Sequence, residues 1–144
     1  MTIIFRYKSV KRPDGTQVKT PSIPILLKGE ETIQVIALLD SGADISAIPK
    51  STAEVLGLDL SWKRTFAFGI GGKVDSIETE VNITLEKGHE KYSFAIPIKV
   101  ILDDYDLPIL LDRNGFFNRF IISFDQNSEK VTLKWIGNSR RMAR

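Results

Sequence analysis

The chain has 144 residues, of which 42% are hydrophobic and 26% charged, with a formal net charge of +2. This composition is ordinary for a soluble globular protein, and the length suits one domain with a substantial core. The chain has no cysteine and one histidine, His89, which excludes disulfides and thiolate chemistry and argues against a histidine-rich metal centre. We expect no metal and no cofactor.

The charge and hydropathy pattern also bear on partners and location. A net charge this small gives no argument for nucleic acid or a membrane as partner. No apolar run approaches the roughly 20 residues that span a bilayer, and the first residues are too briefly apolar for a secretory signal. We therefore expect a cytoplasmic protein.

Short strands dominate the predicted structure from the N-terminus onward. Residues 2–20 are expected to form a hairpin around the turn at 13–16. Residues 22–27 contain Pro24, which limits them to an edge or irregular strand. Residues 32–39 are apolar on both faces near their end, as expected for a central strand.

The rest of the chain continues this pattern with little helix. Residues 49–56 predict a short helix that begins at Pro49 and stops at Gly57, and 113–119 predict one helical turn. Further strands are expected over 62–68, 74–85, 92–102, 107–111, 120–124 and 130–135. Many short strands with one or two short helices predict an all-β, barrel-like fold.

The most informative segment runs from Asp40 to Asp44 (sequence Asp-Ser-Gly-Ala-Asp), directly behind the apolar run 35–39. A carboxylate at the end of a buried strand is costly unless something requires it. Ser41 and Gly42 supply a hydroxyl and a tight turn that hold such a carboxylate. Taken alone, these residues also form ordinary turns.

A strand that delivers Asp-Ser/Thr-Gly-Ala into a turn resembles the aspartic proteases. A single copy in a chain of this length resembles the retroviral type, the retropepsins, in which two identical subunits each contribute one aspartate. The resemblance implies a two-fold symmetric homodimer with Asp40 as the catalytic residue. Ser41 would hydrogen-bond across the dimer, and Gly42 would allow the close approach. Two carboxylates about 3 Å apart share one proton, so the pair provides both an acid and a base for a bound water.

Further segments follow in the family's order, so the resemblance covers roughly residues 22–135. The run at 68–73 is similar to the glycine-rich flap that closes over substrate, although alone it also fits an ordinary glycine hairpin. The substrate-binding residues implied by the resemblance are Ala43, Asp44, Gly69, Ile70, Gly71 and Gly72. An extended peptide would pair with their backbone.

The segment at 107–114 resembles the one that lies behind the family's catalytic loop. Arg113 stands where the family's arginine pairs with the second acid of the loop, here Asp44, and the resemblance implies a partly buried ion pair. Asp112 departs from the pattern, because the family normally has glycine there. Its charge costs energy unless Arg113 or a backbone amide satisfies it.

Two further departures lie at the ends of the chain. Residues 1–21 form an N-terminal extension of the domain expected at 1–136, which would replace the family's dimer contacts or cover the active-site entrance. Residues 137–144 form a basic tail that is expected to be flexible. His89 and the acidic segment 103–106 are expected to be solvated turns.

The sequence thus predicts an all-β, retropepsin-like acid protease barrel that hydrolyses peptide bonds as a homodimer. Its partners would be a peptide or protein substrate and a second copy of itself. An alternative is a catalytically degenerate relative with the same fold and dimer, which binds peptides or proteins without cutting them because of Asp112 and a remodelled active-site entrance. A third reading is a structural β-barrel in which Asp40 only forms a turn.

Overall fold

The protein was analysed as a computed structural model, which describes residues 2–12, 14–61, 63–69, 72–103 and 107–137. Strands make up most of this part of the chain, with one α-helix and one 3-10 helical turn, so the predicted all-β class is confirmed. In chain order the elements are β1 (Thr2–Arg6), β2 (Lys8–Lys11), β3 (Gln17–Thr20), β4 (Ser22–Lys28), β5 (Thr32–Leu39), β6 (Ser46–Pro49), α1 (Lys50–Leu56), β7 (Arg64–Gly69), β8 (Gly72–Lys87), β9 (Glu90–Ile101), β10 (Ile109–Leu111), η1 (Phe117–Arg119), β11 (Phe120–Asp125) and β12 (Lys130–Trp135).

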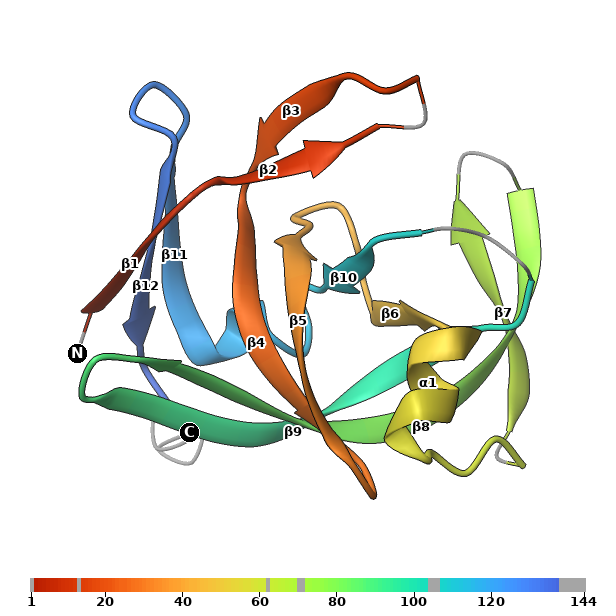
Figure 1. Ribbon diagram of the computed structural model, residues 1–144. Coiled ribbons are helices and arrows are strands. Elements are labelled where there is room, and N and C mark those ends of the chain that lie inside the picture. The colour runs from red at the N-terminus through yellow and green to blue at the C-terminus, as the bar shows by residue number, and fades with distance from the viewer. Residues whose placement is uncertain (1, 13, 62, 70–71, 104–106, 138–144) are drawn as a thin grey trace.

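The main sheet is closed into a barrel. Its strand order is β4-β5-β10-β6-β9-β8-β7, and the additional pairing of β4 with β8 closes the ring (Figure 1). Alternation along each strand fills the interior: in β4 the side chains of Ile23, Ile25 and Leu27 are buried, as the two-residue period of a strand requires. Because β5 and β10 run parallel at the centre of this sheet, their C-terminal ends lie side by side.

The prediction of an edge strand holds for the first part of β4. This strand pairs with β5 along its whole length, but with β8 only over its last three residues. Pro24 lies outside the stretch that pairs with β8, so its missing N–H falls where β4 has a single strand neighbour.

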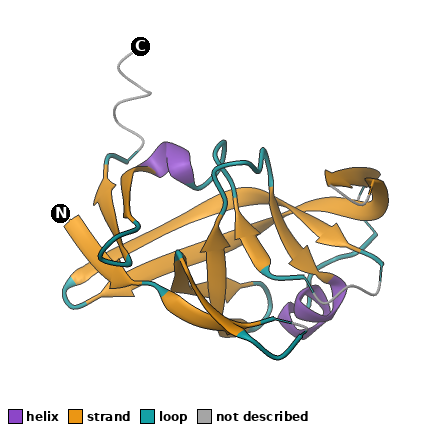
Figure 2. Cartoon of the chain, turned by 90° about the horizontal axis from the view of Figure 1, so that it is seen from above, coloured by secondary structure: helices purple, strands orange, loops and turns teal. Residues whose placement is uncertain are grey.

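The prediction of one N-terminal hairpin holds for β2 and β3 only. β1 instead pairs with β12 near the other end of the chain and forms the sheet β1-β12-β11. The physical reason is burial: Ile3 and Phe5 alternate on one face, and pairing with β12 buries them beside Leu133 and Val131. Figures 1 and 2 show this sheet at the opposite end of the molecule from α1.

The predicted helix is confirmed as α1, and glycines fix its C-terminal end. Gly57 ends it with a φ of 71°, in the left-handed region that favours glycine. Gly29, between β4 and β5, lies so close to the helix end that an added Cβ would be 2.5 Å from the Leu56 carbonyl oxygen. No helix in the described part of the chain is long and apolar enough to cross a membrane. The basic tail predicted beyond Gly137 lies outside the described residues.

Candidate active site

The turn that follows β5 holds Asp40 in a defined position. The Asp40 N–H donates to the Leu111 carbonyl oxygen of β10 at 3.0 Å, which ties the end of one central strand to its neighbour. The Gly42 N–H donates to Asp40 Oδ1 at 2.9 Å, and the Ala43 N–H donates to the Asp40 carbonyl at 3.1 Å. Asp40 is half-buried, so its carboxylate is both oriented by the turn and accessible.

A second segment, directly after β10, supports the far side of this turn. The Arg113 N–H donates to the Ala43 carbonyl at 3.0 Å, and the Asn114 side-chain amide donates to the Asp44 carbonyl at 3.2 Å. The Arg113 guanidinium also pairs with the Asp44 carboxylate. Both side chains of this ion pair are more than half exposed, at 53% and 73%, whereas the sequence predicted a partly buried pair. An exposed ion pair contributes about 0–1 kcal/mol, so we attribute the position of the turn mainly to the backbone hydrogen bonds.

Asp112 is buried, with 2% of its surface exposed, and its carboxylate is satisfied. Oδ1 accepts from the Ser46 hydroxyl at 2.8 Å and from the Phe116 N–H at 3.1 Å, and Oδ2 accepts from the Gly115 N–H at 3.0 Å. The Asp112 N–H in turn donates to Ser46 Oγ at 3.1 Å. Backbone amides and a serine therefore stabilise this carboxylate. Gly115 has little room for a side chain in this arrangement, because an added Cβ would be 2.8 Å from Asp112 Oδ1.

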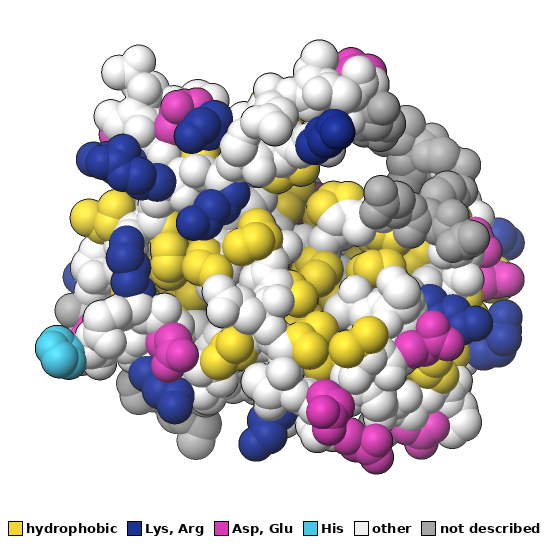
Figure 3. All heavy atoms as spheres, in the orientation of Figure 1, with side chains coloured by type: hydrophobic (Ala, Val, Ile, Leu, Met, Phe, Trp, Pro, Cys, Tyr) yellow, Lys and Arg dark blue, Asp and Glu magenta, His cyan; other side chains and the backbone are white. Residues whose placement is uncertain are grey.

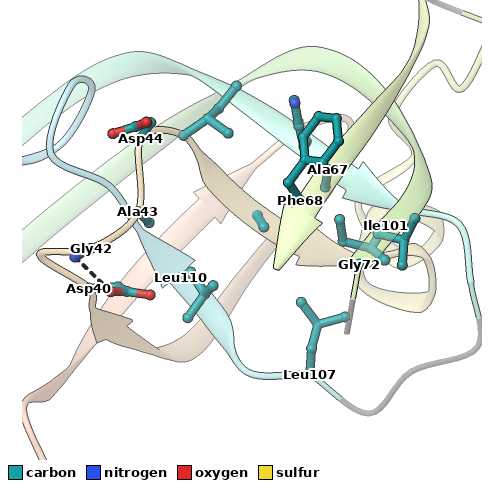
Figure 4. Close-up of a pocket in the computed structure, with 14 residues that line it drawn as sticks. Asp40, Gly42, Ala43, Asp44, Ala67, Phe68, Gly72, Ile101, Leu107 and Leu110 are labelled. Atoms are coloured by element: carbon teal, nitrogen blue, oxygen red, sulfur yellow. Dashed lines mark hydrogen bonds between the residues drawn. The ribbon is translucent and has the colours of Figure 1, made fainter. Parts of the chain in front are cut away.

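A cavity of about 810 Å³ lies between the Asp40 turn and the β7–β8 hairpin. In Figure 4, Asp40 and Leu110 lie on one side of it, and Phe68 and Gly72 of the hairpin lie on the other. Its lining residues are mostly small or apolar: Asp40, Gly42, Ala43, Asp44, Ile45, Ala47, Ala67, Phe68, Gly72, Val74, Lys99, Ile101, Leu107 and Leu110.

The predicted site residues fall into three groups. Asp40, Gly42, Ala43, Asp44 and Gly72 line the cavity. Ser41 is exposed beside it, and its hydroxyl has no hydrogen-bond partner among the described residues. Gly69 ends β7, and Ile70 and Gly71 lie outside the described residues.

Sequence reasoning missed several lining residues. Phe68 at the end of the hairpin is 79% exposed, which is unusual for a large apolar side chain. Lys99 lies on the outer face of β9, between the buried Ile98 and Val100, and donates from Nζ to the Phe66 carbonyl oxygen at 2.6 Å. Phe68 falls in the run predicted as the flap, and Lys99 follows the ordinary alternation of β9, so nothing local marks either side chain as part of a cavity wall; the barrel closure brings both to the Asp40 end. Figure 3 shows hydrophobic side chains gathered in the middle of the face seen in Figure 1, with most charged side chains around its edge.

Three side chains in the described part of the chain have clearly shifted pKa values, and none of them lines this cavity. A hydrogen bond to Glu90, with burial and the charge of that carboxylate, raises the pKa of Tyr92 to about 12. Burial, followed by the charges of Asp125 and Glu129, raises the pKa of Tyr7. Hydrogen bonds from Thr16 hold the pKa of Asp14 below its usual range, at an exposed turn. Among the described residues, no three acidic, histidine or cysteine side chains gather as a metal site would require; of the acidic segment 103–106, only Asp103 is described, and it is exposed.

Comparison with known proteins identifies the fold. No protein-family model and no curated protein matches the chain. Among solved structures, a retropepsin-like aspartic protease from Rickettsia conorii is similar, with a TM-score of 0.57 and 21% identity over 92% of this chain and 90% of that one. EIAV protease complexed with the inhibitor HBY-793 also matches, with a TM-score of 0.47 and 23% identity over 67% of this chain and 84% of that one. The suspected resemblance is thus confirmed at the level of architecture: this chain has the retropepsin-like aspartic protease fold.

Proposed function

We propose that this protein is an aspartic endopeptidase whose active site forms when two copies associate, each contributing Asp40. The observation that carries the proposal is the Asp40 carboxylate itself. It lines the cavity next to the β7–β8 hairpin and is oriented by the Gly42 N–H at 2.9 Å. The retropepsin-like fold of the chain supports the same function.

One carboxylate is insufficient for this chemistry. Hydrolysis by a bound water needs a base to activate the water and an acid to protonate the leaving nitrogen. Two carboxylates in contact hold one shared proton between them, because both cannot be ionised at that distance. A two-fold axis close to Asp40 supplies the second carboxylate, since a residue near such an axis meets its own copy.

The exposed Ser41 hydroxyl fits this arrangement. It lies beside Asp40, has no partner within the described part of the chain, and is free to bond across the axis. The β7–β8 hairpin would serve as the flap, because β7 pairs only with β8 among the described strands and keeps one edge open. An extended peptide would bind between this edge and the Asp40 turn by main-chain hydrogen bonds.

The decisive experiment uses the Asp40→Asn variant of the full chain. Purified wild-type protein is incubated with a mixed peptide pool from acidic to neutral pH, with and without a statine-type inhibitor, and products are identified by mass spectrometry. We expect cleavage that the inhibitor blocks and that Asp40→Asn abolishes. Asp125→Asn, an exposed aspartate on β11 outside the cavity lining, is the matched control and should keep full activity. Full activity of the Asp40 variant would refute the assignment.

Mixing the two proteins tests whether the site is shared. If each active site needs two Asp40 carboxylates, adding excess Asp40→Asn protein to a fixed amount of wild type should suppress activity as mixed dimers form. Activity per mole of wild type should also rise with concentration. A monomer at micromolar concentration that cleaves peptides, unaffected by added variant, would argue against a shared site.

The alternative of a degenerate binding module rested on Asp112 and on a remodelled active-site entrance. Its carboxylate oxygens are engaged by Ser46 and by the amides of Gly115 and Phe116, so this departure gives no specific support for lost catalysis. Peptide binding without cleavage by the wild-type protein would favour the alternative. A monomer with neither property would favour the purely structural reading.

A further inference from the structure

Lys99 is the only basic side chain among the described residues that line the cavity. It lies on the strand β9, half-buried, and its neighbours in register on the lining are Ala47 and, one strand further, Leu110. The other charged side chains of this lining are the carboxylates of Asp40 and Asp44, so Lys99 is the one described position at which the cavity wall presents a positive charge to a bound peptide.

The contacts of Lys99 leave most of its hydrogen-bonding capacity unused. An ammonium group has three donors, and the one hydrogen bond of Nζ within the described residues goes to the Phe66 carbonyl oxygen of β7 at 2.6 Å. Glu78 stands directly opposite Lys99 on β8, but the two side chains form no ion pair. The ammonium is thus held between the barrel wall and the hairpin strand, and no carboxylate of the described residues pairs with it.

We propose that Lys99 forms a subsite for an acidic side chain, Asp or Glu, of the bound peptide. This inference rests on the proposed function, because it assigns a specificity to the same cleft. Lys99 is on β9, three strand spacings from β5, which ends at Asp40; this is a lateral distance of about 14 Å. An extended peptide advances about 3.3 Å per residue, so this distance corresponds to about four residues, and the acidic side chain would lie within about four residues of the cleaved bond. A symmetric dimer places one Lys99 on each side of that bond.

Cleavage profiling of a peptide library tests the subsite. We expect wild type to prefer Asp or Glu at such a position over Leu, and Lys99→Met to reduce kcat/KM for an acidic peptide about tenfold relative to its Leu-matched peptide. Lys99→Arg should keep the preference, and Lys99→Glu should shift it toward Lys or Arg. Glu78→Gln is the matched control: it removes the opposite carboxylate and should keep or strengthen the acidic preference.

Failure of this inference can be distinguished from failure of the proposed function. If wild type cuts peptides without acidic preference, or Lys99→Met leaves the ratio unchanged, the Lys99 subsite is wrong and the protease assignment stands. If wild type cuts nothing, the protease assignment fails, and binding decides the subsite. Fluorescently labelled acidic and Leu-matched peptides are then titrated into Asp40→Asn protein with and without Lys99→Met. Equal affinity of the two peptides for Asp40→Asn would overturn the inference; tighter binding of the acidic peptide that Lys99→Met removes would support it.

Discussion

Replacing Asp112 with glycine, the residue that retropepsins normally have there, is expected to destabilise this protein. The carboxylate accepts three hydrogen bonds while only 2% of the residue surface is exposed. Asp112→Gly removes the acceptor for the amides of Gly115 and Phe116 and for the Ser46 hydroxyl. A buried donor without a partner loses its hydration and gains nothing in return.

The size of the effect follows from these contacts. Hydrogen bonds to a charged group contribute about 1.5–3 kcal/mol each, but three bonds to one carboxylate are not additive, and water can enter the space left by the side chain. We therefore expect a loss of about 3 kcal/mol, and glycine adds about 0.5–1 kcal/mol of backbone entropy. For a chain of this size, 1 kcal/mol lowers the Tm by about 2–4 °C, so the Tm should fall by roughly 10 °C.

Urea unfolding at pH 7, followed by tryptophan fluorescence, measures the free energy of unfolding directly. Asp125→Ala is the matched control, because Asp125 Oδ1 also accepts an N–H three residues ahead, from Ser128 at 3.0 Å, but at an exposed turn. It should cost about 1 kcal/mol or less. The Ser46→Ala, Asp112→Gly double variant should lose less stability than the sum of its single variants, because both remove one shared hydrogen bond. If Asp112→Gly were as stable as wild type, the assigned role of this carboxylate would be wrong.

Two other predictions concern the turn and the far end of the barrel. Gly42→Ala should lower kcat for peptide hydrolysis while the protein stays folded, because the added Cβ would be 3.3 Å from Asp40 Oδ1 and would displace that carboxylate. Unchanged peptide hydrolysis by the folded variant would contradict this prediction. Tyr92→Phe should reduce the amount by which the free energy of unfolding falls at alkaline pH. The hydrogen bond to Glu90 raises the tyrosine pKa from 10.0 to about 12, so its contribution is complete below pH 10 and is lost as the pH rises toward 12. Urea unfolding at pH 8 and 11 should show a smaller loss for the variant, and an identical loss would contradict the reasoning.

Much of the fold was predictable because the residues that determine each strand, helix end and turn lie close together in the sequence. The alternation in β8 and β9, the proline and glycine at the ends of α1, and the turn that separates β11 from β12 all appear within short windows of sequence. The partner of β1 was not predictable in this way. Its pairing with β12 depends on which core has room for Ile3 and Phe5, and that is a property of the assembled barrel.

The candidate site likewise has a part that the local sequence predicts and a part that depends on contacts between distant residues. The turn from Asp40 to Asp44 is contiguous, so its geometry could be expected from the residues and from the family resemblance. The partners of Asp112 include Ser46, which is 66 positions away in the sequence, and nothing local marks that serine as a ligand of a carboxylate. Lys99 was overlooked for the same reason, because a lysine in a half-buried strand ordinarily points to solvent.

The contacts of Asp112 give a structural explanation for the aspartate that stands where the family normally has glycine. Asp112 lies in the segment whose backbone supports the Asp40 turn, between Leu111, which accepts the Asp40 N–H, and Arg113, which donates to Ala43. A pair of carboxylates that shares a proton tolerates little displacement, so the proposed chemistry requires this support to be rigid. The buried carboxylate fixes the segment to β6 through Ser46 and to the chain ahead through two amides. In the family, glycine allows close packing at this point; here an aspartate with three donors achieves a defined position by hydrogen bonding. The residue that first suggested lost activity is therefore better explained as an anchor for the turn that carries Asp40.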